Sequence, residues 1–495
     1  LHFDCKPRYV VSARCDLAFN VDMAETTKTP AEILKDEGNA LFAKALYKEA
    51  IVKYTEAIAL DDKNEIFWCN RAFANLKSEN FGAAIEDAAK SIERNPRHAK
   101  AYFHRATANM ILGHLDEALK DFLAVTQMLP TNKDARQKYD ACYAAKRTEL
   151  FEAAIAGPAT KAASEMSLDS FVVPANYDGP VYSNPSSVSY VTSLLEHFRL
   201  QKNMEKRHCF ELIIDAIKYF KKQPTLVNIT VQGDTSITVC GDTHGQFYDV
   251  LNLLNINGAP SEKNMYLFNG DFVDRGSFSC EVILSFLAYK LLYPNHFFLA
   301  RGNHESLNMN KMYGFEGEAR AKYGDKAYPL FQELFCTLPL AHVINDKVFV
   351  VHGGLFSDDG VTLDQIKKIH RFREPPSEGG LMSDMLWSDP QPMLGRGPSK
   401  RGVGMSFGPD VTKRFCEENG LKMVIRSHEA KAEGYEIEAD GKLVTVFSAP
   451  NYCDHAGNLG GYIKFEEGME PEYFTFEAVP HPEVPALRYA SPFAM

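Results

Sequence analysis

Five short apolar runs in the second half of the chain each lead into polar residues that can bind a metal ion. The runs cover residues 237–240, 265–268, 297–300, 348–351 and 423–425, and their composition predicts short buried strands. The polar residues that follow them are Asp242 and His244, Asp271, Asn303, His352 and His428. Because active sites of α/β sheets gather at strand ends, we expect one pocket to collect all six side chains.

The chemistry of these six residues suits a pair of metal ions. Hard divalent cations prefer carboxylate and amide oxygen, whereas imidazole suits zinc, iron and manganese. A mixed set of Asp, Asn and His therefore fits two ions that share one bridging carboxylate. A single such motif occurs by chance, and a lone histidine at a strand end is often structural, but five motifs in order favour a two-metal site.

The same motifs carry a family resemblance. The segments GDTHGQ, GDFVDRGSFS, RGNHES, HGGL, RSHEAKAEGYE and SAPNYC resemble the signature blocks of the PPP family of serine/threonine phosphatases. Binuclear phosphodiesterases and dinucleoside polyphosphate hydrolases share the Asp-x-His and Asn-His pieces, but they are not expected to carry both RSHE and SAPNYC. The resemblance implies a phosphatase of phosphoserine and phosphothreonine in proteins. Its fold would be an α/β metallophosphatase domain, a β-sandwich flanked by helices.

The resemblance also assigns the metal ligands. It implies two divalent ions per catalytic domain, drawn from manganese, magnesium, iron and zinc. One ion would be bound by Asp242 and His244, the other by Asn303, His352 and His428, with Asp271 bridging the two. Such a pair lowers the pKa of bound water and holds the phosphoryl oxygens for in-line attack.

His304, which follows a ligand directly, is the imidazole placed to protonate the leaving serine or threonine oxygen. Asp274 would hold that imidazole in one tautomer, so that the pair acts as an oriented general acid. The alternatives for His304 are a seventh metal ligand and a simple pocket wall.

Two arginines and a tyrosine are expected to contact the phosphate. Arg275 and Arg401 would bind it through paired N–H donors, for which the guanidinium group is suited. Lys400 is adjacent to Arg401, but the SKRGVG context favours the arginine. Tyr452 in SAPNYC would close over the site, with a role as a loop anchor as the equal alternative.

The first part of the chain repeats itself with a period of 34 residues. Small or apolar residues recur in aligned columns: Gly38, Ala72 and Ala106; Tyr47, Phe81 and Leu115; Ala50, Ala84 and Ala118; Ala57, Ser91 and Val125. This is the tetratricopeptide pattern, in which two antiparallel helices per unit approach closely at the small residues. Three units, the minimum for a stable stack, predict an all-α helical repeat domain.

Polar residues at fixed repeat positions predict a peptide-binding groove. Lys35, Asn39, Asn70 and Lys100 occupy the positions that grip the C-terminal carboxylates of chaperones ending in EEVD in related domains, which implies partners of the heat-shock protein 90 type. Each residue alone could be an ordinary solvated side chain. The family usually has Arg where this chain has His104, and an unperturbed imidazole would make peptide binding stronger at pH 6 than at pH 8.

Composition shifts divide the chain into segments. We expect a disordered N-terminal segment at 1–30, the three repeats at 31–132, a capping helix and a linker at 133–185, the PPP catalytic domain at 186–480, and a C-terminal tail at 481–495. Met23, the first residue of MAETTKTP, is a candidate start of the natural protein. Two helices, at 188–202 and 206–222, are expected to precede the first catalytic strand.

The layout resembles PPP phosphatases in which a tetratricopeptide domain precedes the catalytic domain, and that resemblance implies autoinhibition. An acidic surface of the repeats would cover Arg275 and Arg401. Glu79, in the turn of the second repeat, is the candidate contact, although a solvated turn residue is the alternative. A different class of function is a chaperone-binding scaffold with minor phosphatase activity, but the intact ligand motifs, His304 and Asp274 argue against it.

Composition adds limits on partners and compartment. With 54 basic and 65 acidic residues the net charge is -11, which gives no electrostatic reason to expect nucleic-acid binding. No apolar stretch is long enough for a membrane span, and no signal peptide is visible. The ten cysteines are scattered without a CxxC spacing, which favours reduced thiols and a cytoplasmic and nuclear location.

Overall fold

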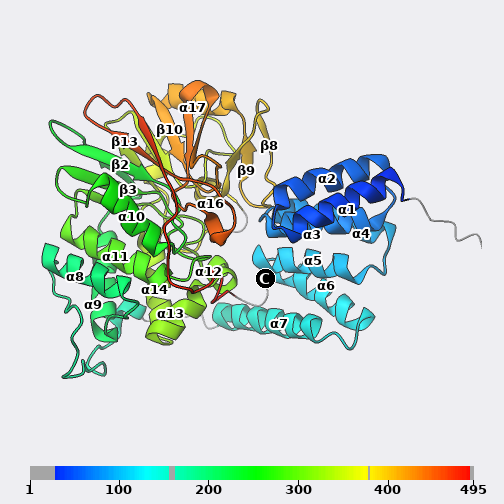
Figure 1. The fold of residues 1–495 in the computed structure, drawn as a ribbon, viewed down its shortest axis with the longest axis horizontal. Coiled ribbons are helices and arrows are strands. Elements are labelled where there is room, and N and C mark those ends of the chain that lie inside the picture. Colours follow the sequence, from blue (N-terminus) through cyan, green and yellow to red (C-terminus); the bar gives the residue numbers. More distant parts are fainter. Residues whose placement is uncertain (1–27, 155–161, 377–378, 491–495) are drawn as a thin grey trace, which may run out of the picture.

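The computed structural model describes residues 28–154, 162–376 and 379–490. A helical domain and an α/β domain lie side by side, and the helical domain faces α12 and the β8–β9 region of its neighbour (Figure 1). Most of the expected disordered segment at 1–30 lies outside the described residues. No helix among those described is both long and apolar enough to cross a membrane.

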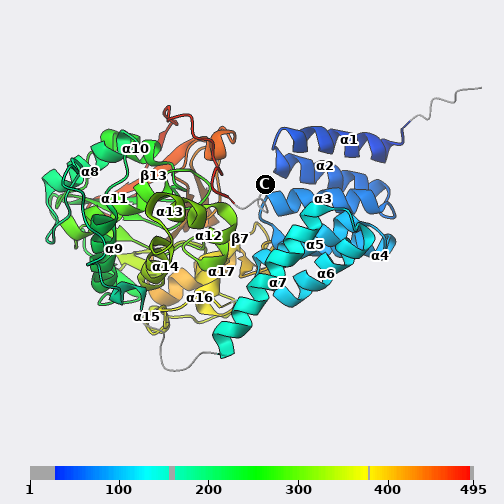
Figure 2. The same cartoon turned by 90° about the horizontal axis from the view of Figure 1, so that it is seen from below.

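The helical domain consists of three helix pairs and a longer final helix. The pairs are α1 (Pro30–Ala43) with α2 (Tyr47–Leu60), α3 (Glu65–Lys77) with α4 (Phe81–Arg94), and α5 (Ala99–Ile111) with α6 (Leu115–Met128). The helix α7 (Lys133–Ala154) packs on α6 and extends from the stack toward the α/β domain (Figure 2). The predicted helical repeat fold is confirmed.

The small residues of the repeat occupy helix contacts, as their spacing predicts. A Cβ atom added at Gly38 would lie 2.6 Å from the ring of Tyr54, so only glycine allows α1 and α2 to approach this closely. Ala72 and Ala106, the equivalent residues of the later repeats, are completely buried. The thirty-four-residue period therefore records close packing between helices.

The α/β domain contains ten α-helices among its described residues and three sheets. The helices are α8 (Val188–Arg199), α9 (Lys206–Phe220), α10 (Phe247–Asn257), α11 (Ser279–Leu292), α12 (Leu307–Tyr313), α13 (Phe315–Tyr323), α14 (Ala327–Thr337), α15 (Leu363–Lys367), α16 (Leu381–Trp387) and α17 (Pro409–Asn419). The strands are β1 (Leu226–Ile229), β2 (Ser236–Cys240), β3 (Asn264–Phe268), β4 (Phe297–Leu299), β5 (Ala341–Ile344), β6 (Val348–Val351), β7 (Asp389–Pro390), β8 (Arg396–Pro398), β9 (Met405–Phe407), β10 (Met423–Arg426), β11 (Tyr435–Glu438), β12 (Leu443–Val446), β13 (Gly460–Phe465) and β14 (Glu472–Phe476).

The five expected strands correspond to β2, β3, β4, β6 and β10, but they belong to two sheets. A six-stranded sheet has the order β1-β5-β6-β10-β12-β11, and a five-stranded sheet has the order β14-β13-β2-β3-β4. Parallel pairing of β2 with β3, β3 with β4 and β6 with β10 brings the carboxyl ends of these strands together within each sheet. The candidate ligands therefore come from the edges of two sheets.

The two sheets pack face to face. Ile237, Val239 and Leu267 of the five-stranded sheet share a buried cluster with Val350 and Ile425 of the six-stranded sheet. The resulting β-sandwich, which the family resemblance implied, holds the ligand-bearing strand ends in a fixed relation.

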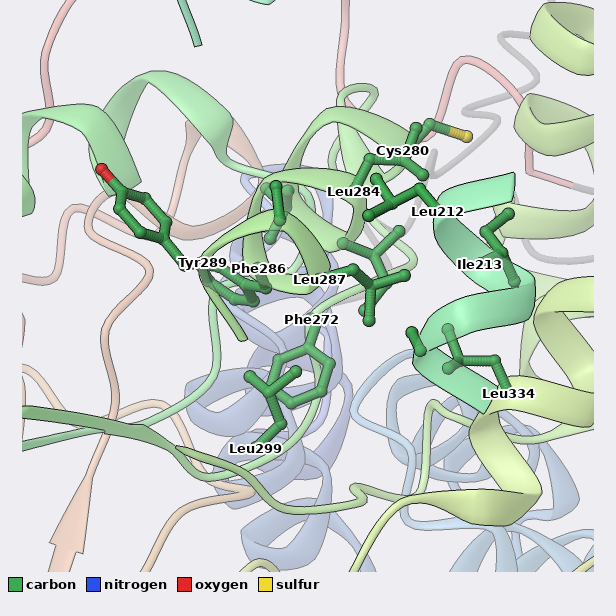
Figure 3. Packing of buried hydrophobic residues seen from close by; sticks show 14 of the residues in the cluster. Leu212, Ile213, Phe272, Cys280, Leu284, Phe286, Leu287, Tyr289, Leu299 and Leu334 are labelled. Carbon is green, nitrogen blue, oxygen red and sulfur yellow. The ribbon is translucent and has the colours of Figure 1, made fainter. Parts of the chain in front are cut away.

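The other face of the five-stranded sheet is covered by helices. Leu299 of β4 packs in one cluster with Leu212 of α9, Leu284 of α11 and Leu334 of α14 (Figure 3). The helix α11 is buried on nearly all its faces, which explains why its sequence is apolar throughout. A core of this size anchors the loops that leave β2, β3 and β4.

Segments on both sides of the catalytic domain pack onto it. Ser164, inside the expected linker, donates from its backbone N–H and its hydroxyl to Glu333 at 2.8 and 2.6 Å, and Phe171 packs on the helical core. At the other end, the N–H of Val479 donates to Asp249 at 2.9 Å. The latter half of the linker thus lies against the catalytic domain rather than between domains.

Candidate active site

The loops that leave β2, β3, β4, β6 and β10 converge on one buried site. Asp242, Asp271, Asn303 and His352 are at most 1 % exposed, and His428 is 7 % exposed. The two sheets are tied together here, because the backbone N–H of His428 donates to the Asp242 carboxylate at 3.1 Å. All six expected ligands are close neighbours, with His244 on the same loop as Asp242.

His244 turns a lone pair toward two carboxylates. Its Nδ1 lies 3.0 Å from the carbonyl oxygen of Val273, and a carbonyl only accepts, so Nδ1 carries the proton. The unprotonated Nε2 then faces Oδ2 of Asp242 at 3.8 Å and Oδ2 of Asp271 at 3.6 Å. One imidazole nitrogen and two carboxyl groups form the first candidate cation site.

His352 presents a second site of the same kind. Its Nδ1 donates to the carbonyl of Asn269 at 2.8 Å, which leaves a lone pair on Nε2. That nitrogen lies 2.9 Å from Oδ1 of Asn303, 3.2 Å from Nδ1 of His428 and 3.3 Å from Oδ2 of Asp271. Turned over, the Asn303 amide would donate to these neighbours; in the orientation found here its oxygen faces acceptors only, as a cation ligand must.

Asp271 is common to both sites. It belongs to a cluster with His244 and to another with His352 and His428. Burial, followed by the charge of Asp271, raises the pKa of Asp242 to about 8, and burial raises the pKa of Asp271 to about 8. Divalent cations would offset this buried negative charge, and oxygen with imidazole nitrogen suits manganese, iron or zinc. The residues present therefore fit two ions with Asp271 between them.

His304 and Asp274 form a buried pair beside the first cluster. Nδ1 of His304 is 2.9 Å from Oδ2 of Asp274, and both side chains are at most 2 % exposed. Oδ1 of Asp274 accepts from the backbone N–H of Phe315 at 2.9 Å, so the carboxylate is held at both oxygens. His304 also has a ring nitrogen within 4.8 Å of the ligand atoms of His244 and Asp271, which keeps its alternative as a ligand open.

Arg275 lies beside the metal cluster with its guanidinium over an aromatic face. Its Cζ is 3.7 Å from the ring centroid of Tyr313, an arrangement that fixes the planar group. The side chain is 12 % exposed, and its backbone has a φ of 69°, on the same turn as Asp274. The GDFVDRG motif thus places Asp271, Asp274 and Arg275 on one loop.

Arg401 reaches the same site from the loop between β8 and β9. Its Nε donates to Asp389 at 2.6 Å, and its terminal nitrogen donates to the carbonyl of His428 at 3.1 Å. Lys400 is exposed. The geometry agrees with the expectation that the arginine, rather than the lysine, faces the site.

Tyr452 packs against one side of the group of candidate metal ligands. Its ring lies 5.2 Å from the ring of His244 and 5.2 Å from that of Phe447. Burial raises the pKa of its phenol well above the ordinary value, so the group is a neutral donor and acceptor. The packing on His244 is compatible with both roles expected for this residue.

Glu305 supports the ligand loops and was not singled out from the sequence. Its buried carboxylate accepts from the backbone N–H groups of Asp271, Phe272 and Gly302, each at 2.8 Å. It thereby joins the turn that carries the shared ligand to the turn that carries Asn303. The signal available was its place in the RGNHE motif, immediately after His304.

The repeat domain contacts this site through Glu79. This residue lies in the turn between α3 and α4 with a φ of 61°, and its carboxylate is ion-paired with Arg275. Its other oxygen is 3.7 Å from a terminal nitrogen of Arg401. Lys77, two residues earlier, is close enough to Arg275 for its pKa to be lowered, first by burial and then by the arginine's charge.

The predicted peptide clamp is partly preassembled. The amide oxygen of Asn39 accepts from Asn70 at 3.1 Å and from the Tyr54 hydroxyl at 2.8 Å, which joins the first and second repeats. Lys35 pairs with its neighbour Asp36 at 2.9 Å, and Lys100 is exposed.

His104 differs from the expected titrating residue. Its ring stacks on Phe73 with centroids 4.6 Å apart, and burial followed by the charges of nearby lysines, Lys138 and Lys100 first, lowers its pKa to about 3. In the free protein it is therefore neutral at pH 6 as well as at pH 8, which removes the basis for the expected pH dependence. This burial could not be predicted from the repeat pattern, because Lys138, one of the lysines near the ring, comes from α7 outside the three repeats.

A buried cluster of metal-binding side chains at the strand ends of a β-sandwich, flanked by a histidine–aspartate pair and two arginines, defines the class of metallophosphoesterases. Residues 235–432 match the calcineurin-like phosphoesterase family, and residues 139–228 match the PPP5 TPR repeat region. The chain is 49% identical to human serine/threonine-protein phosphatase 5 over 465 residues, 93% of each chain. The chain therefore belongs to the serine/threonine-protein phosphatase 5 family, and its catalytic domain is a serine/threonine-protein phosphatase.

Other relatives agree with this assignment. Serine/threonine-protein phosphatase T of Trypanosoma brucei brucei is 50% identical over 94% of this chain and 98% of its own. A solved structure of a protein serine/threonine phosphatase from Saccharomyces cerevisiae, described as similar to human phosphatase PP5, is 47% identical with a TM-score of 0.59. It covers 61% of this chain and 100% of its own length. The metallophosphatase fold is thus confirmed.

Proposed function

We propose that the buried cluster holds two metal ions and that His304 is the general acid for the leaving oxygen. Asp242 and His244 would hold one ion, Asn303, His352 and His428 the other, and Asp271 both. The observation that carries the proposal is the convergence of ligand lone pairs. The tautomers of His244 and His352, which direct their Nε2 lone pairs into the site, are fixed by the carbonyls of Val273 and Asn269. When bound, the ions would activate water and stabilise phosphoryl charge.

The side chains around the cluster support the remaining steps. Arg275 and Arg401 would bind the phosphate oxygens through their N–H groups and so orient the phosphorus atom. His304 would give its Nε2 proton to the serine or threonine oxygen as that bond breaks, while Asp274 holds Nδ1–H and favours the cationic imidazole before transfer. Tyr452 would exclude water from one side.

Metal analysis combined with two substrates tests the assignment. We expect about two ions of manganese, iron, zinc or magnesium per chain and turnover of a phosphoserine peptide. A dinucleoside polyphosphate should be a poor substrate, because its cleavage belongs to the small-molecule hydrolases that share only part of the motif set. One ion per chain, or faster turnover of the dinucleotide, would contradict the proposal.

We further propose that the repeat domain keeps the resting enzyme inhibited. The pairing of Glu79 with Arg275, and its approach to Arg401, supports this, because a carboxylate there competes with a phosphate for the same cations. At a second contact the N–H of Ala83 donates to the carbonyl of Lys400 at 3.1 Å, next to Arg401. The repeat domain would therefore hold the phosphate-binding loop as well as block it.

The packing around these polar contacts supports a defined closed state. Phe81 is completely buried and belongs, with Ile111 and Leu112, to the hydrophobic cluster that contains Trp387 and Phe407 of the catalytic domain. An enzyme that lacks residues 1–160 should therefore be several-fold more active than the full chain. A cut at 170 would be less informative, because it removes Ser164 and its hydrogen bonds to the catalytic domain.

Finally, we propose that the groove of the repeat domain binds the acidic C-termini of heat-shock protein 90 type chaperones. Lys35, Lys100 and the linked amides of Asn39 and Asn70 support a carboxylate clamp. Titration calorimetry with an EEVD peptide tests the clamp; wild-type affinity in a Lys100→Ala variant would contradict it.

We also propose a cytoplasmic and nuclear location for the enzyme. The eight cysteines among the described residues are free thiols, which supports it.

A further inference from the structure

We infer that Asn310 is a positioning residue for the His304–Asp274 pair and that Gln332 supports the orientation of its amide. They form a chain of side-chain hydrogen bonds that starts on α14, passes through α12 and ends on the Asp274 carboxylate. Among the described residues, the side chains of Asn310 and Gln332 hydrogen-bond to each other, to Asp274 and to the His304 backbone, and to none of the six expected metal ligands. The inference rests on the proposed role of His304 as general acid, and it assigns a task to residues that no sequence motif indicated.

Asn310 connects both members of the pair. It lies on α12 and is completely buried. Its Nδ2 donates to Oδ2 of Asp274 at 2.9 Å and to the backbone carbonyl of His304 at 2.6 Å. An amide nitrogen has two hydrogens, so both donors are used. The side chain therefore fixes where the carboxylate lies relative to the backbone that carries the imidazole.

Gln332 binds the oxygen of the Asn310 amide. Its Nε2 donates to Oδ1 of Asn310 at 2.7 Å, from a position on α14. An inverted Asn310 amide has almost the same shape, but its oxygen would face the Asp274 carboxylate, and two acceptors would then repel each other. The Gln332 donor adds to this preference, because in the orientation found it pairs with the Asn310 oxygen, while the two acceptors on Asp274 and His304 hold the Asn310 nitrogen.

The arrangement matters because Asp274 orients His304 through the same oxygen that Asn310 holds. Oδ2 of Asp274 receives both His304 Nδ1 and Asn310 Nδ2, whereas Oδ1 receives only the N–H of Phe315. Without the Asn310 amide, the Asp274 carboxylate would keep its hydrogen bonds to the Phe315 N–H and to His304 but would lose its third support, so it could rotate. The imidazole would then lose its fixed direction toward the leaving oxygen, while the metal ligands would keep their own supports.

The first test compares leaving groups. Asn310→Ala should reduce turnover of a phosphoserine peptide roughly tenfold, as expected for one hydrogen bond to a charged group. Turnover of p-nitrophenyl phosphate, whose leaving group needs no proton, should fall less than about twofold. Metal content should be unchanged. Equal losses with both substrates, or loss of metal, would mean that Asn310 is only structural.

A second pair of variants leaves Asn310 in place. Gln332→Glu has only acceptors and would draw the Asn310 nitrogen toward α14, so it should reproduce the peptide-selective loss. Gln332→Met should remain near wild type, because the acceptors on Asp274 and His304 still orient the amide. Equal peptide turnover in these two variants would overturn the role of Gln332, and this comparison remains available if Asn310→Ala folds poorly.

A double-mutant cycle separates this inference from the proposed function. In a His304→Ala background, Asn310→Ala should cause no further loss of peptide turnover, because the residue acts through the histidine. An additional tenfold loss there would overturn the inference. If His304→Ala itself slowed both substrates equally, the general-acid role would fail instead; a selective effect of His304→Ala without one for Asn310→Ala would defeat the positioning role alone.

Discussion

The catalytic site and the repeat groove both gather charge, but they hold it in different ways. In the catalytic site Asp242, Asp271 and His352 are at most 1 % exposed, and each is fixed by backbone hydrogen bonds or by a neighbouring ligand. In the proposed groove Lys100 is exposed, and Lys35 forms an ion pair with its neighbour Asp36. The first arrangement is rigid before anything binds, whereas the second leaves long side chains to be ordered by a ligand.

The difference follows from what each region must do. Catalysis gains most from charges that are already oriented in a site without water, because no reorganisation is then needed during the reaction. The proposed recognition of a chaperone tail would need specificity with release, and partly solvated cations provide attraction that water and salt moderate. Substitutions should therefore have large, local effects in the first region and small, graded effects in the second.

The largest effect is expected at the shared ligand. Asp271→Asn keeps the shape of the side chain but removes its charge from both metal clusters, so turnover should fall by at least about a thousandfold, since each ion contributes several kcal/mol. Metal content measured by mass spectrometry should fall with it. Lys35→Ala in the groove is the matched control and should retain full turnover. If Asp271→Asn retained both ions, a substitution in the catalytic site would have as small an effect as one in the repeat domain, and the contrast between the two regions would be wrong.

His304→Ala should rank next. Turnover of a phosphoserine peptide should fall about a hundredfold or more, the usual contribution of a positioned general acid. The loss should be much smaller with an aryl phosphate, and both ions should remain bound. Metal loss in this variant would instead indicate that His304 is a seventh ligand, which its distance to the first cluster allows.

Glu79→Gln tests the place where the two regions meet. Removing the charge that pairs with Arg275 should raise resting turnover several-fold, because the phosphate no longer competes with a carboxylate. Glu117→Gln on the exposed side of α6 is a control of the same chemistry and should change nothing. Basal activity equal to that of the wild type in both variants would show that the ion pair does not restrain the enzyme.

The smallest effect is expected at His104. Its pKa of about 3 lies below the ordinary value, so the imidazole is neutral above that pH and contributes no charge at pH 6 or pH 8. A peptide would need to supply about 5 kcal/mol to restore the ordinary pKa. His104→Arg should therefore strengthen EEVD binding by about 1 kcal/mol at both values. Calorimetry that finds the gain only at pH 8 would mean that the wild-type imidazole is charged at pH 6.

The convergence of the candidate ligands could be predicted from sequence because each sits in a short motif at the end of a strand. Their distribution over two sheets could not be read from strand composition, because β4 and β6 look alike locally but pair with different partners. Asn310 and Gln332 were missed for a related reason: their bond joins residues on separate helices, and neither lies in a recognised motif. The low pKa of His104 depends on tertiary burial, which spacing alone does not reveal.

The contact between Gly82 and Gly402 has a consequence for how such an enzyme can change by mutation. A methyl group at Gly82 would meet the backbone nitrogen and Cα of Gly402 at 2.8 and 2.9 Å, beside the loop of Arg401. A side chain at this point would disturb the contact and the cluster that the two domains share, whereas each domain also has a cluster of its own that would keep it folded. Under the inhibition proposed above, mutation at these two glycines would therefore yield a more active enzyme, and selection would act on excess activity rather than on loss of folded protein.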